Sequence, residues 1–246
     1  MNVFIDKVLD DDLLAELREM MDNLGPQPLP EGEDPESQLG QMATSDYWSP
    51  VVSADDAIAR KKNYECMIQS GSQHVQKVLP ILANKLMENK AFASVGLVDC
   101  LFPPKFNKYD AGCFYGSHCD EPLARDGNGR RLRADMAYTL WLSDQQDYVG
   151  GELVIDDGMS EPQMHKPKAG SLLLYSATDV HRVDEVISGT RYAMVGWAQS
   201  LIADESLRQE VYRVNKLLDE LGNAGERGLF LKLEAHRNTL LRLWSN

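Results

Sequence analysis

The stretch YGSHCDEP, residues 115–122, contains two side chains that can bind a metal ion. His118 and Asp120 are two positions apart, and side chains two apart in an extended chain point to the same face. The pair could therefore hold one ion, with Cys119 facing away. A His-x-Asp pair is a weak signal by itself, because such pairs occur by chance in many chains.

A distant histidine strengthens the metal hypothesis. His181 follows His118 by 63 residues, and two histidines with one carboxylate form the facial triad that leaves adjacent positions of an octahedral Fe(II) free. The gap is too long for one local loop and suits ligands on opposite strands of a barrel. The pattern predicts an open iron site at which substrate chemistry occurs.

Arg191 follows His181 by ten residues, at the start of the next predicted strand. If a 2-oxo acid chelates the iron through its keto and carboxylate oxygens, its other carboxylate needs a buried, planar cation. A guanidinium fits that geometry better than an ammonium does. We therefore predict 2-oxoglutarate as the co-substrate.

The elements that must position these residues are short strands. From Leu97 the chain is rich in β-branched and aromatic residues, in segments separated by glycine-containing turns, which is typical of an antiparallel sandwich or barrel. We predict a jelly roll, a double-stranded β-helix like that of cupins. Its strands are LVDCLF, KFNKYD, DMAYTLWLS, GELVI, GSLLLY, HRVDEVI and RYAMVGWAQSL.

Helical periodicity flanks this core on both sides. The stretches DDDLLAELREMMDNLG and SQHVQKVLPILANKLMENK predict helices before it, with a kink or a new start at Pro80. ESLRQEVYRVNKLLDELG and ERGLFLKLEAHRNTLLRLW predict helices after it. The predicted fold class is α+β. It comprises a helical region with an acidic loop packed on the core at 1–96, the jelly roll at 97–202 and a helical extension at 203–246.

Charge and composition exclude several classes of function. The chain has a net charge of −13, and residues 1–60 hold fourteen acidic residues against three basic ones, so no cluster of Lys and Arg is available to bind nucleic acid. There is no long apolar run and no signal-peptide pattern, so we expect a cytoplasmic protein without a membrane partner. The four cysteines include no C-x-x-C pair, which favours reduced thiols.

The sequence resembles the bacterial PKHD-type hydroxylases, relatives of the prolyl 4-hydroxylases in the Fe(II)/2-oxoglutarate dioxygenase superfamily. The resemblance covers most of residues 60–246 and joins several motifs in order. These are PPKFNKYDAG, GSHCDEP, RADMAYTLWLS, YVGGELVI, KAGSLLLYSATDVHRVDEVISGTRYAMVGWAQSLI and HRNTLLRLW.

The resemblance implies roles for residues at matching positions. His118, Asp120 and His181 would be the catalytic iron ligands, and Arg191 would bind the distal carboxylate of 2-oxoglutarate. Tyr109 matches a tyrosine that hydrogen-bonds the same co-substrate.

Three further positions are second-tier candidates for contacts in the pocket. Thr139 and Trp141 share a strand face that lines the 2-oxoglutarate pocket in similar proteins, and Trp197 falls on a core strand beside the metal. For both tryptophans, a role as plain core aromatics is an equal alternative.

The chain departs from the usual members around its iron ligands, and some histidines fit no ligand pattern. Bulky apolar residues often occupy the positions of Ser117 and Cys119 in relatives, and Cys113 and Phe114 precede them, so substrate contacts are expected to differ. The remaining histidines are expected to be structural or surface groups: His74, His165 and His236.

The resemblance implies a dioxygenase that uses Fe(II), 2-oxoglutarate and O2 to hydroxylate an unactivated C–H bond, releasing succinate and CO2. L-ascorbate is a candidate further cofactor. The presence of Asp120 argues against a halogenase, in which a small residue replaces the carboxylate ligand. The substrate class stays open between a small molecule, an amino acid and a peptide or protein side chain, and a homodimer is a candidate oligomeric state.

Two other functional classes remain as alternatives. A non-catalytic cupin-like module could bind or sense metal and 2-oxoglutarate on the same fold, and a zinc hydrolase could share the triad. Arg191 together with Tyr109 favours the dioxygenase, because a bare metal-binding module has no need of a carboxylate clamp.

Residues 26–60 combine an acidic, disorder-like stretch with the aromatic stretch SDYWSPVV. One hypothesis is a lid, in which Tyr47 and Trp48 pack over the barrel mouth and acidic neighbours favour a cationic or neutral substrate. The alternative is a loop packed on the helical flank, away from the site.

Overall fold

The computed structural model describes residues 2–25, 48–53, 60–67, 73–125 and 129–245, which form five helices and sixteen strands. The helices are α1 (Asp11–Asn23), α2 (Gln73–Glu88), α3 (Lys90–Gly96), α4 (Glu205–Asn223) and α5 (Arg227–Trp244). The strands are β1 (Val3–Ile5), β2 (Ser49–Val52), β3 (Lys61–Met67), β4 (Val98–Leu101), β5 (Lys105–Tyr109), β6 (Phe114–His118), β7 (Leu123–Arg125), β8 (Arg131–Arg133), β9 (Met136–Trp141), β10 (Tyr148–Gly150), β11 (Leu153–Asp156), β12 (Gln163–His165), β13 (Leu172–Ser176), β14 (Val180–Val183), β15 (Val186–Gly189) and β16 (Arg191–Ser200).

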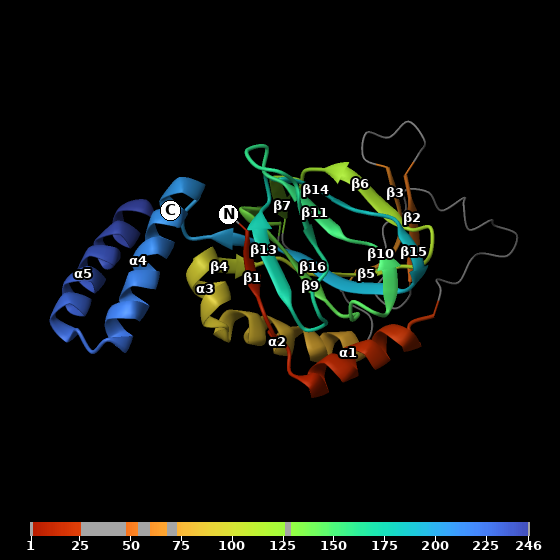
Figure 1. The fold of residues 1–246 in the computed structure, drawn as a ribbon, viewed down its shortest axis with the longest axis horizontal. Coiled ribbons are helices and arrows are strands. Elements are labelled where there is room, and N and C mark those ends of the chain that lie inside the picture. The colour runs from red at the N-terminus through yellow and green to blue at the C-terminus, as the bar shows by residue number, and fades with distance from the viewer. Residues whose placement is uncertain (1, 26–47, 54–59, 68–72, 126–128, 246) are drawn as a thin grey trace, which may run out of the picture.

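Twelve of the strands form one antiparallel sheet, which is strongly curled (Figure 1). Its order is β1-β13-β9-β16-β5-β3-β6-β14-β11-β12, with β2 beside β3 and β4 beside β16. Strand β3 pairs with both β5 and β6. It therefore connects the part of the sheet that contains β9 and β16 to the part that contains β14. The curl brings β6 and β14 opposite β9 and β16.

The main sheet is buried on both faces, and its side chains alternate between two apolar clusters. In β9 every residue is buried. Met136, Tyr138 and Leu140 belong to the outer cluster, while Ala137 and Trp141 belong to the inner one. This alternation is the period of two expected for a strand. A strand buried on both faces reads as a continuous apolar run, as β9 does.

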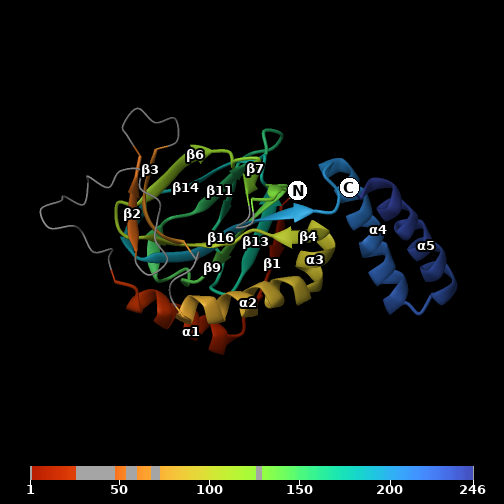
Figure 2. The same cartoon turned by 180° about the vertical axis from the view of Figure 1, so that it is seen from behind.

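Helices α1, α2 and α3 cover the outer face of the sheet, whereas α4 and α5 project from one end of it (Figures 1 and 2). Helix α1 begins where the Asp10 side chain accepts a hydrogen bond from the Leu13 backbone N–H, 3.0 Å away. It buries three side chains at helical spacing, Leu13, Leu17 and Met21. In contrast, α5 buries none of its residues completely.

The observed elements agree with the predicted α+β class, with helices on both sides of a β core. The stretch HRVDEVI forms two strands, β14 and β15, and α2 continues through Pro80 without a new start. The N-terminal region also contributes β1, β2 and β3 to the sheet, which the sequence analysis did not predict. Strand β3, KKNYECM, is rich in residues that strands usually lack, so its composition does not indicate a strand.

The position of Trp48 contradicts the lid hypothesis. Of the two aromatic residues expected to cover the barrel mouth, the structure describes only this one. Its side chain is 3% exposed, its ring stacks on Tyr192 at 5.9 Å, and its Nε1 donates to the Met21 carbonyl at 3.1 Å. These partners place it on the helix-covered face of the sheet. Tyr47 and the acidic stretch lie outside the described residues.

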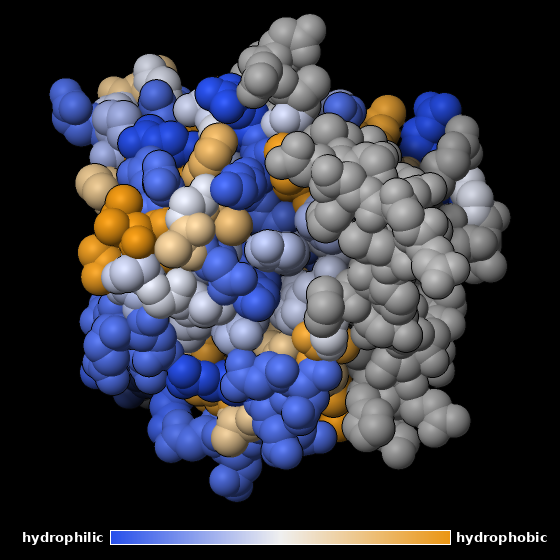
Figure 3. Space-filling view, turned by 90° about the vertical axis from the view of Figure 1, so that its right-hand side faces the viewer, coloured by the Kyte–Doolittle hydropathy of each residue, from blue (hydrophilic) through white to orange (hydrophobic). Residues whose placement is uncertain are grey.

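The side of the molecule on which β2, β10 and β15 lie is mainly hydrophilic. Figure 3 shows small, separate apolar areas among the described residues of this side. On β10 and β15, the side chains of Val149 and Ile187 are exposed. No helix among the described residues is long and apolar enough to cross a membrane.

Candidate active site

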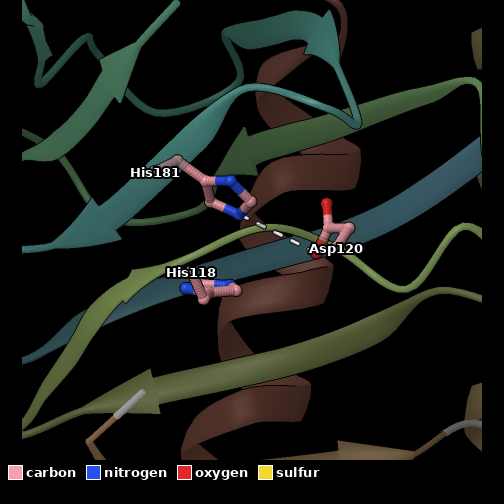
Figure 4. Close-up of side chains that lie close together, drawn as sticks. All are labelled: His118, Asp120 and His181. Carbon is pink, nitrogen blue, oxygen red and sulfur yellow. Dashed lines mark ion pairs between the residues drawn. The ribbon is translucent and has the colours of Figure 1, made fainter. Parts of the chain in front are cut away.

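The structure brings His118, Asp120 and His181 together inside the curled sheet. Strands β6 and β14 are antiparallel, and His118 is paired directly with His181. Asp120 follows two residues after His118, just beyond the end of β6. One ligand atom from each of the three residues lies within 4.8 Å of the others, and the side chains point toward one another (Figure 4).

Backbone contacts orient both imidazole rings. The Nδ1 atom of His118 lies 2.9 Å from the Gly116 carbonyl, and that of His181 lies 3.0 Å from the Asp179 carbonyl. Each Nδ1 therefore carries the proton, and each Nε2 lone pair is available as a ligand. The arrangement is the one that metal-binding histidines require.

Asp120 completes a set of donors suited to a divalent metal. Its Oδ1 lies 3.8 Å from the Nε2 atom of His181, and its Oδ2 is buried without a hydrogen-bond partner among the described residues. A buried carboxylate oxygen without a partner is costly unless a cation or donor satisfies it. Two nitrogens and one carboxylate facing a shared space fit Fe(II).

The electrostatics of His118 favour the neutral ring that a metal needs. Burial, and then the neighbouring His181, lower the pKa of His118 to about 4. Its ring is stacked on Tyr115 with centroids 3.6 Å apart. The imidazole is therefore uncharged at neutral pH and is held in place by the tyrosine.

Arg191 lies in the same cavity and has no acidic partner among the residues that the structure describes. Its side chain is 1% exposed, and its guanidinium carbon lies 5.1 Å from the centre of the Tyr109 ring and 5.8 Å from that of Trp141. No carboxylate of the described residues lies within 4.0 Å of it, and its Nε has no hydrogen-bond partner among them. A buried cation without an anion is strongly unfavourable, so this end of the cavity suits an anionic ligand.

Tyr109 and Arg191 face each other across neighbouring strands. They are directly paired in the register of β5 and β16, and both line the cavity. Burial raises the pKa of Tyr109 well above its ordinary value, although Arg191 opposes that rise. The phenol therefore keeps its proton and can donate a hydrogen bond to an anion beside Arg191.

The pair Gly150–Gly151 in YVGGELVI lets the chain pass close to Arg191. Both residues have positive φ, 75° and 68°, a region that glycine adopts readily. A Cβ atom on Gly151 would lie 2.8 Å from Cγ2 of Val186 and 3.2 Å from Cδ of Arg191. This motif therefore serves the packing around the guanidinium stem.

The three second-tier residues have two different positions: two of them line the cavity, and the third packs behind Arg191. Thr139 and Trp197 line the cavity, and the Nε1 of Trp197 is buried without a partner among the described residues. Trp141 is fully buried in the inner cluster and is not part of the cavity lining. It contacts the guanidinium of Arg191, so it supports the arginine rather than facing the cavity.

The cavity opens to solvent. Its lining also includes three charged residues that the sequence analysis missed, Lys61, Glu65 and Lys105. Their only sequence signal is the alternation of charged residues in KKNYECM and KFNKY, which is equally typical of a solvent-exposed edge. No feature of the neighbouring sequence indicates that these charged side chains face the cavity.

The other candidate groups lie apart from the triad. His165 is on the terminal strand β12, and His236 is exposed on α5. The side chain of His74 lies outside the described residues. None of the four cysteines forms a disulfide bond, and the sulfur of Cys119 lies 3.7 Å from the Thr178 carbonyl.

Comparison with known proteins places the chain in a family. The model of the 2OG-Fe(II) oxygenase superfamily matches residues 104–199. A PKHD-type hydroxylase of Pseudomonas putida (strain W619) is 35% identical over 187 residues, which cover 75% of this chain and 82% of that protein. Another, from Burkholderia ambifaria (strain MC40-6), is 30% identical over 246 residues, covering 100% of this chain and 99% of that protein. The chain belongs to the PKHD-type hydroxylases.

Solved structures support the jelly-roll fold of this PKHD-type hydroxylase. A 2OG-Fe(II) oxygenase family oxidoreductase from Burkholderia pseudomallei has a TM-score of 0.57 at 16% identity, covering 80% of this chain and 84% of that one. A prolyl-4-hydroxylase from Pseudomonas putida has a TM-score of 0.50 at 19% identity, covering 81% and 92%. The predicted family and fold class are confirmed.

Membership of this family makes the chain an Fe(II)- and 2-oxoglutarate-dependent dioxygenase, an enzyme of the hydroxylase type. Its donor set agrees with that chemistry. The carboxylate of Asp120, which a halogenase lacks, is present and faces the histidine nitrogens.

Proposed function

We propose that His118, Asp120 and His181 hold Fe(II) and that Arg191, with Tyr109, binds the distal carboxylate of 2-oxoglutarate. The proposal rests on the contents of one cavity. It contains three convergent metal-ligand atoms together with a buried arginine that no described carboxylate pairs with. A metal-binding module without 2-oxoglutarate would leave that arginine unneutralised.

The protein's own groups bind and orient the ligands, and they exclude water from the cavity. The Tyr109 hydroxyl donates a hydrogen bond to the carboxylate that Arg191 pairs with, and Trp141 supports the guanidinium from behind. Thr139 and Trp197 shape the cavity wall. The bound metal, with 2-oxoglutarate and O2, supplies the oxidation, and the substrate C–H bond must be held beside the open metal positions.

We propose hydroxylation of an unactivated C–H bond in a small molecule, an amino acid or a peptide. One structural relative is a prolyl-4-hydroxylase from Pseudomonas putida, which supports an amino-acid-like target. The four cysteines form no disulfide bond, which favours a cytoplasmic location. L-ascorbate as a reductant that keeps the iron ferrous, a homodimeric state and the division into 1–96, 97–202 and 203–246 remain parts of this proposal.

The deciding experiment is release of succinate from 2-oxoglutarate in air, with and without added Fe(II). We expect slow, iron-dependent release in the absence of the primary substrate, and none with Zn(II) alone. The Asp120→Ala variant should lose it. Binding of 2-oxoglutarate without any succinate release would instead support the sensing module, and hydrolytic activity with Zn(II) would support the zinc hydrolase.

A further inference from the structure

Three charged side chains line the cavity but have no part in holding iron or 2-oxoglutarate. Lys61 and Glu65 are on β3, and Lys105 is on the neighbouring strand β5. Their side chains are 13%, 8% and 27% exposed, respectively. Charged groups are rarely buried this deeply unless they are paired or have a ligand. The balance of positive and negative charge in this cluster therefore indicates what charge a ligand would carry.

Two ammonium groups share one carboxylate here. Lys61 donates a hydrogen bond to Oε1 of Glu65, and Nζ of Lys105 lies 3.7 Å from Oε2. Among the described residues, no other carboxylate lies within 4.0 Å of either ammonium. Both oxygens of Glu65 are therefore engaged, and the cluster retains one positive charge in excess.

The ionisation of the cluster agrees with this count. Burial raises the pKa of Glu65, but the two lysines together hold it below its ordinary value. Burial lowers the pKa of Lys61, and Glu65 only partly opposes that effect. The carboxylate is thus ionised, while the ammonium of Lys61 is incompletely compensated.

The cluster lies beside the metal ligands rather than beside Arg191. Nζ of Lys61 is 4.3 Å from the centre of the Tyr115 ring, which stacks on His118. Nζ of Lys105 is 5.4 Å from the centre of the Trp197 ring. Lys105 is four positions from the 2-oxoglutarate residue Tyr109 on β5, about 13 Å along the strand. The cavity therefore has two separate cationic centres.

We propose that Lys61 and Lys105 bind a carboxylate group of the primary substrate and that Glu65 positions the two ammonium groups. This rests on the proposed function, which assigns Arg191 to 2-oxoglutarate. One excess positive charge matches a monoanionic carboxylate better than a dianionic phosphate. The substrate class is thus a small carboxylic acid, with its reacting C–H bond between the lysines and the metal, and not a cationic or neutral compound.

The test compares N-acetyl amino acids with their uncharged amides as probes. The protein is loaded with Mn(II), a paramagnetic substitute for Fe(II), and with saturating 2-oxoglutarate, and the relaxation of probe protons is measured by NMR. We expect the carboxylates to be relaxed strongly and to bind at least about tenfold more tightly than their amides. This comparison needs no variant. Equal binding of amides, or no carboxylate that exceeds its amide, overturns the proposal.

Variants locate the effect in the cluster. Lys105→Met should weaken carboxylate binding by about tenfold. The matched control is Lys216→Met, since Lys216 lies over the Tyr212 ring at 5.7 Å on α4, outside the cavity, and it should change nothing. An unchanged affinity in Lys105→Met overturns the proposal. Glu65→Gln should retain carboxylate binding. If the unmodified protein instead binds amine probes and Glu65→Gln loses that binding, the site binds cations and the proposal is overturned.

The same samples separate this inference from the proposed function. Relaxation of the 2-oxoglutarate protons by Mn(II) reports whether the metal and Arg191 assignments hold, and it also shows that each variant is folded. If 2-oxoglutarate is relaxed but acids and amides bind alike, only the substrate inference fails. If 2-oxoglutarate is not relaxed in the unmodified protein, the proposed function itself fails.

Discussion

The two faces of the main sheet are built from different residue types. The outer face, covered by α1, α2 and α3, packs mainly aliphatic side chains, such as the fully buried Leu17, Leu140 and Met194. The inner face is rich in aromatic rings and alanine, as in Trp141 and Ala137, and it borders the cavity that holds the charged residues.

Polar atoms without partners mark the same division. Among the described residues, several buried side-chain atoms lack a hydrogen bond, and none of them belongs to the outer cluster. Five belong to the inner cluster or the cavity: Asp120 Oδ2, Trp141 Nε1, Tyr148 Oη, Arg191 Nε and Trp197 Nε1. Such atoms cost stability unless a ligand satisfies them. The outer face therefore stabilises the fold, whereas the inner face is left incomplete for ligands.

The largest effect on ligands is expected from His118→Ala. With Fe(II) and 2-oxoglutarate and without oxygen, the unmodified protein should give a weak visible charge-transfer band, and the variant should give none because a metal ligand is missing. Absorbance spectroscopy measures this. His236→Ala, on the exposed face of α5, is the matched control and should keep the band. A band and turnover that survive in His118→Ala would remove it from the metal site.

Arg191→Ala should raise the 2-oxoglutarate requirement while iron binding persists. Losing one side of a buried charge pair costs about 3–5 kcal/mol, or several hundredfold or more in affinity. Succinate release against 2-oxoglutarate concentration measures it.

The control for Arg191 is Arg208, which is also buried but donates to the carbonyls of Ile202 and Ala203 at 2.9 and 2.7 Å. Arg208→Ala should lower the melting temperature without changing the 2-oxoglutarate requirement. If both variants shift that requirement equally, the effect of Arg191 is structural.

Tyr109→Phe should have a smaller effect of the same kind. It removes one hydrogen bond to a carboxylate and keeps the ring against Arg191, so we expect about a tenfold weaker 2-oxoglutarate affinity. Titration of the charge-transfer band gives this value directly. An unaltered affinity would show that the phenol does not reach the co-substrate.

Leu17→Ala, on the outer face, should leave ligand affinity unchanged. Leu17 is 0% exposed, and the cavity left by its truncation should cost about 2–5 kcal/mol of unfolding free energy. Denaturant unfolding measures the loss, and 2-oxoglutarate affinity below the transition is the second readout. A large change in that affinity would contradict the separation of the two faces.

The triad and Arg191 could be selected from the sequence because their chemistry is specific. Few side chains bind iron or a buried carboxylate, and His118, Asp120, His181 and Arg191 occur in strand-like segments that a barrel can bring together. The longer strands β4, β5, β9, β11, β13 and β16 were equally predictable, since apolar and aromatic runs between glycine turns are typical of strands. Their periodicity is local information, present in any short window of the chain. The short strands β7, β8, β10 and β12 were not predicted.

Only the tertiary structure decided which way the remaining side chains face. Trp48 packs outside the sheet and Trp141 behind Arg191, although both are simply aromatic residues in the sequence. Lys61 and Glu65 of β3 line the cavity because β5 and β6 pair with this strand on both sides, and strand pairing depends on residues far away in the chain. Lys61, Glu65 and Lys105 therefore become one cluster only when the sheet closes around them.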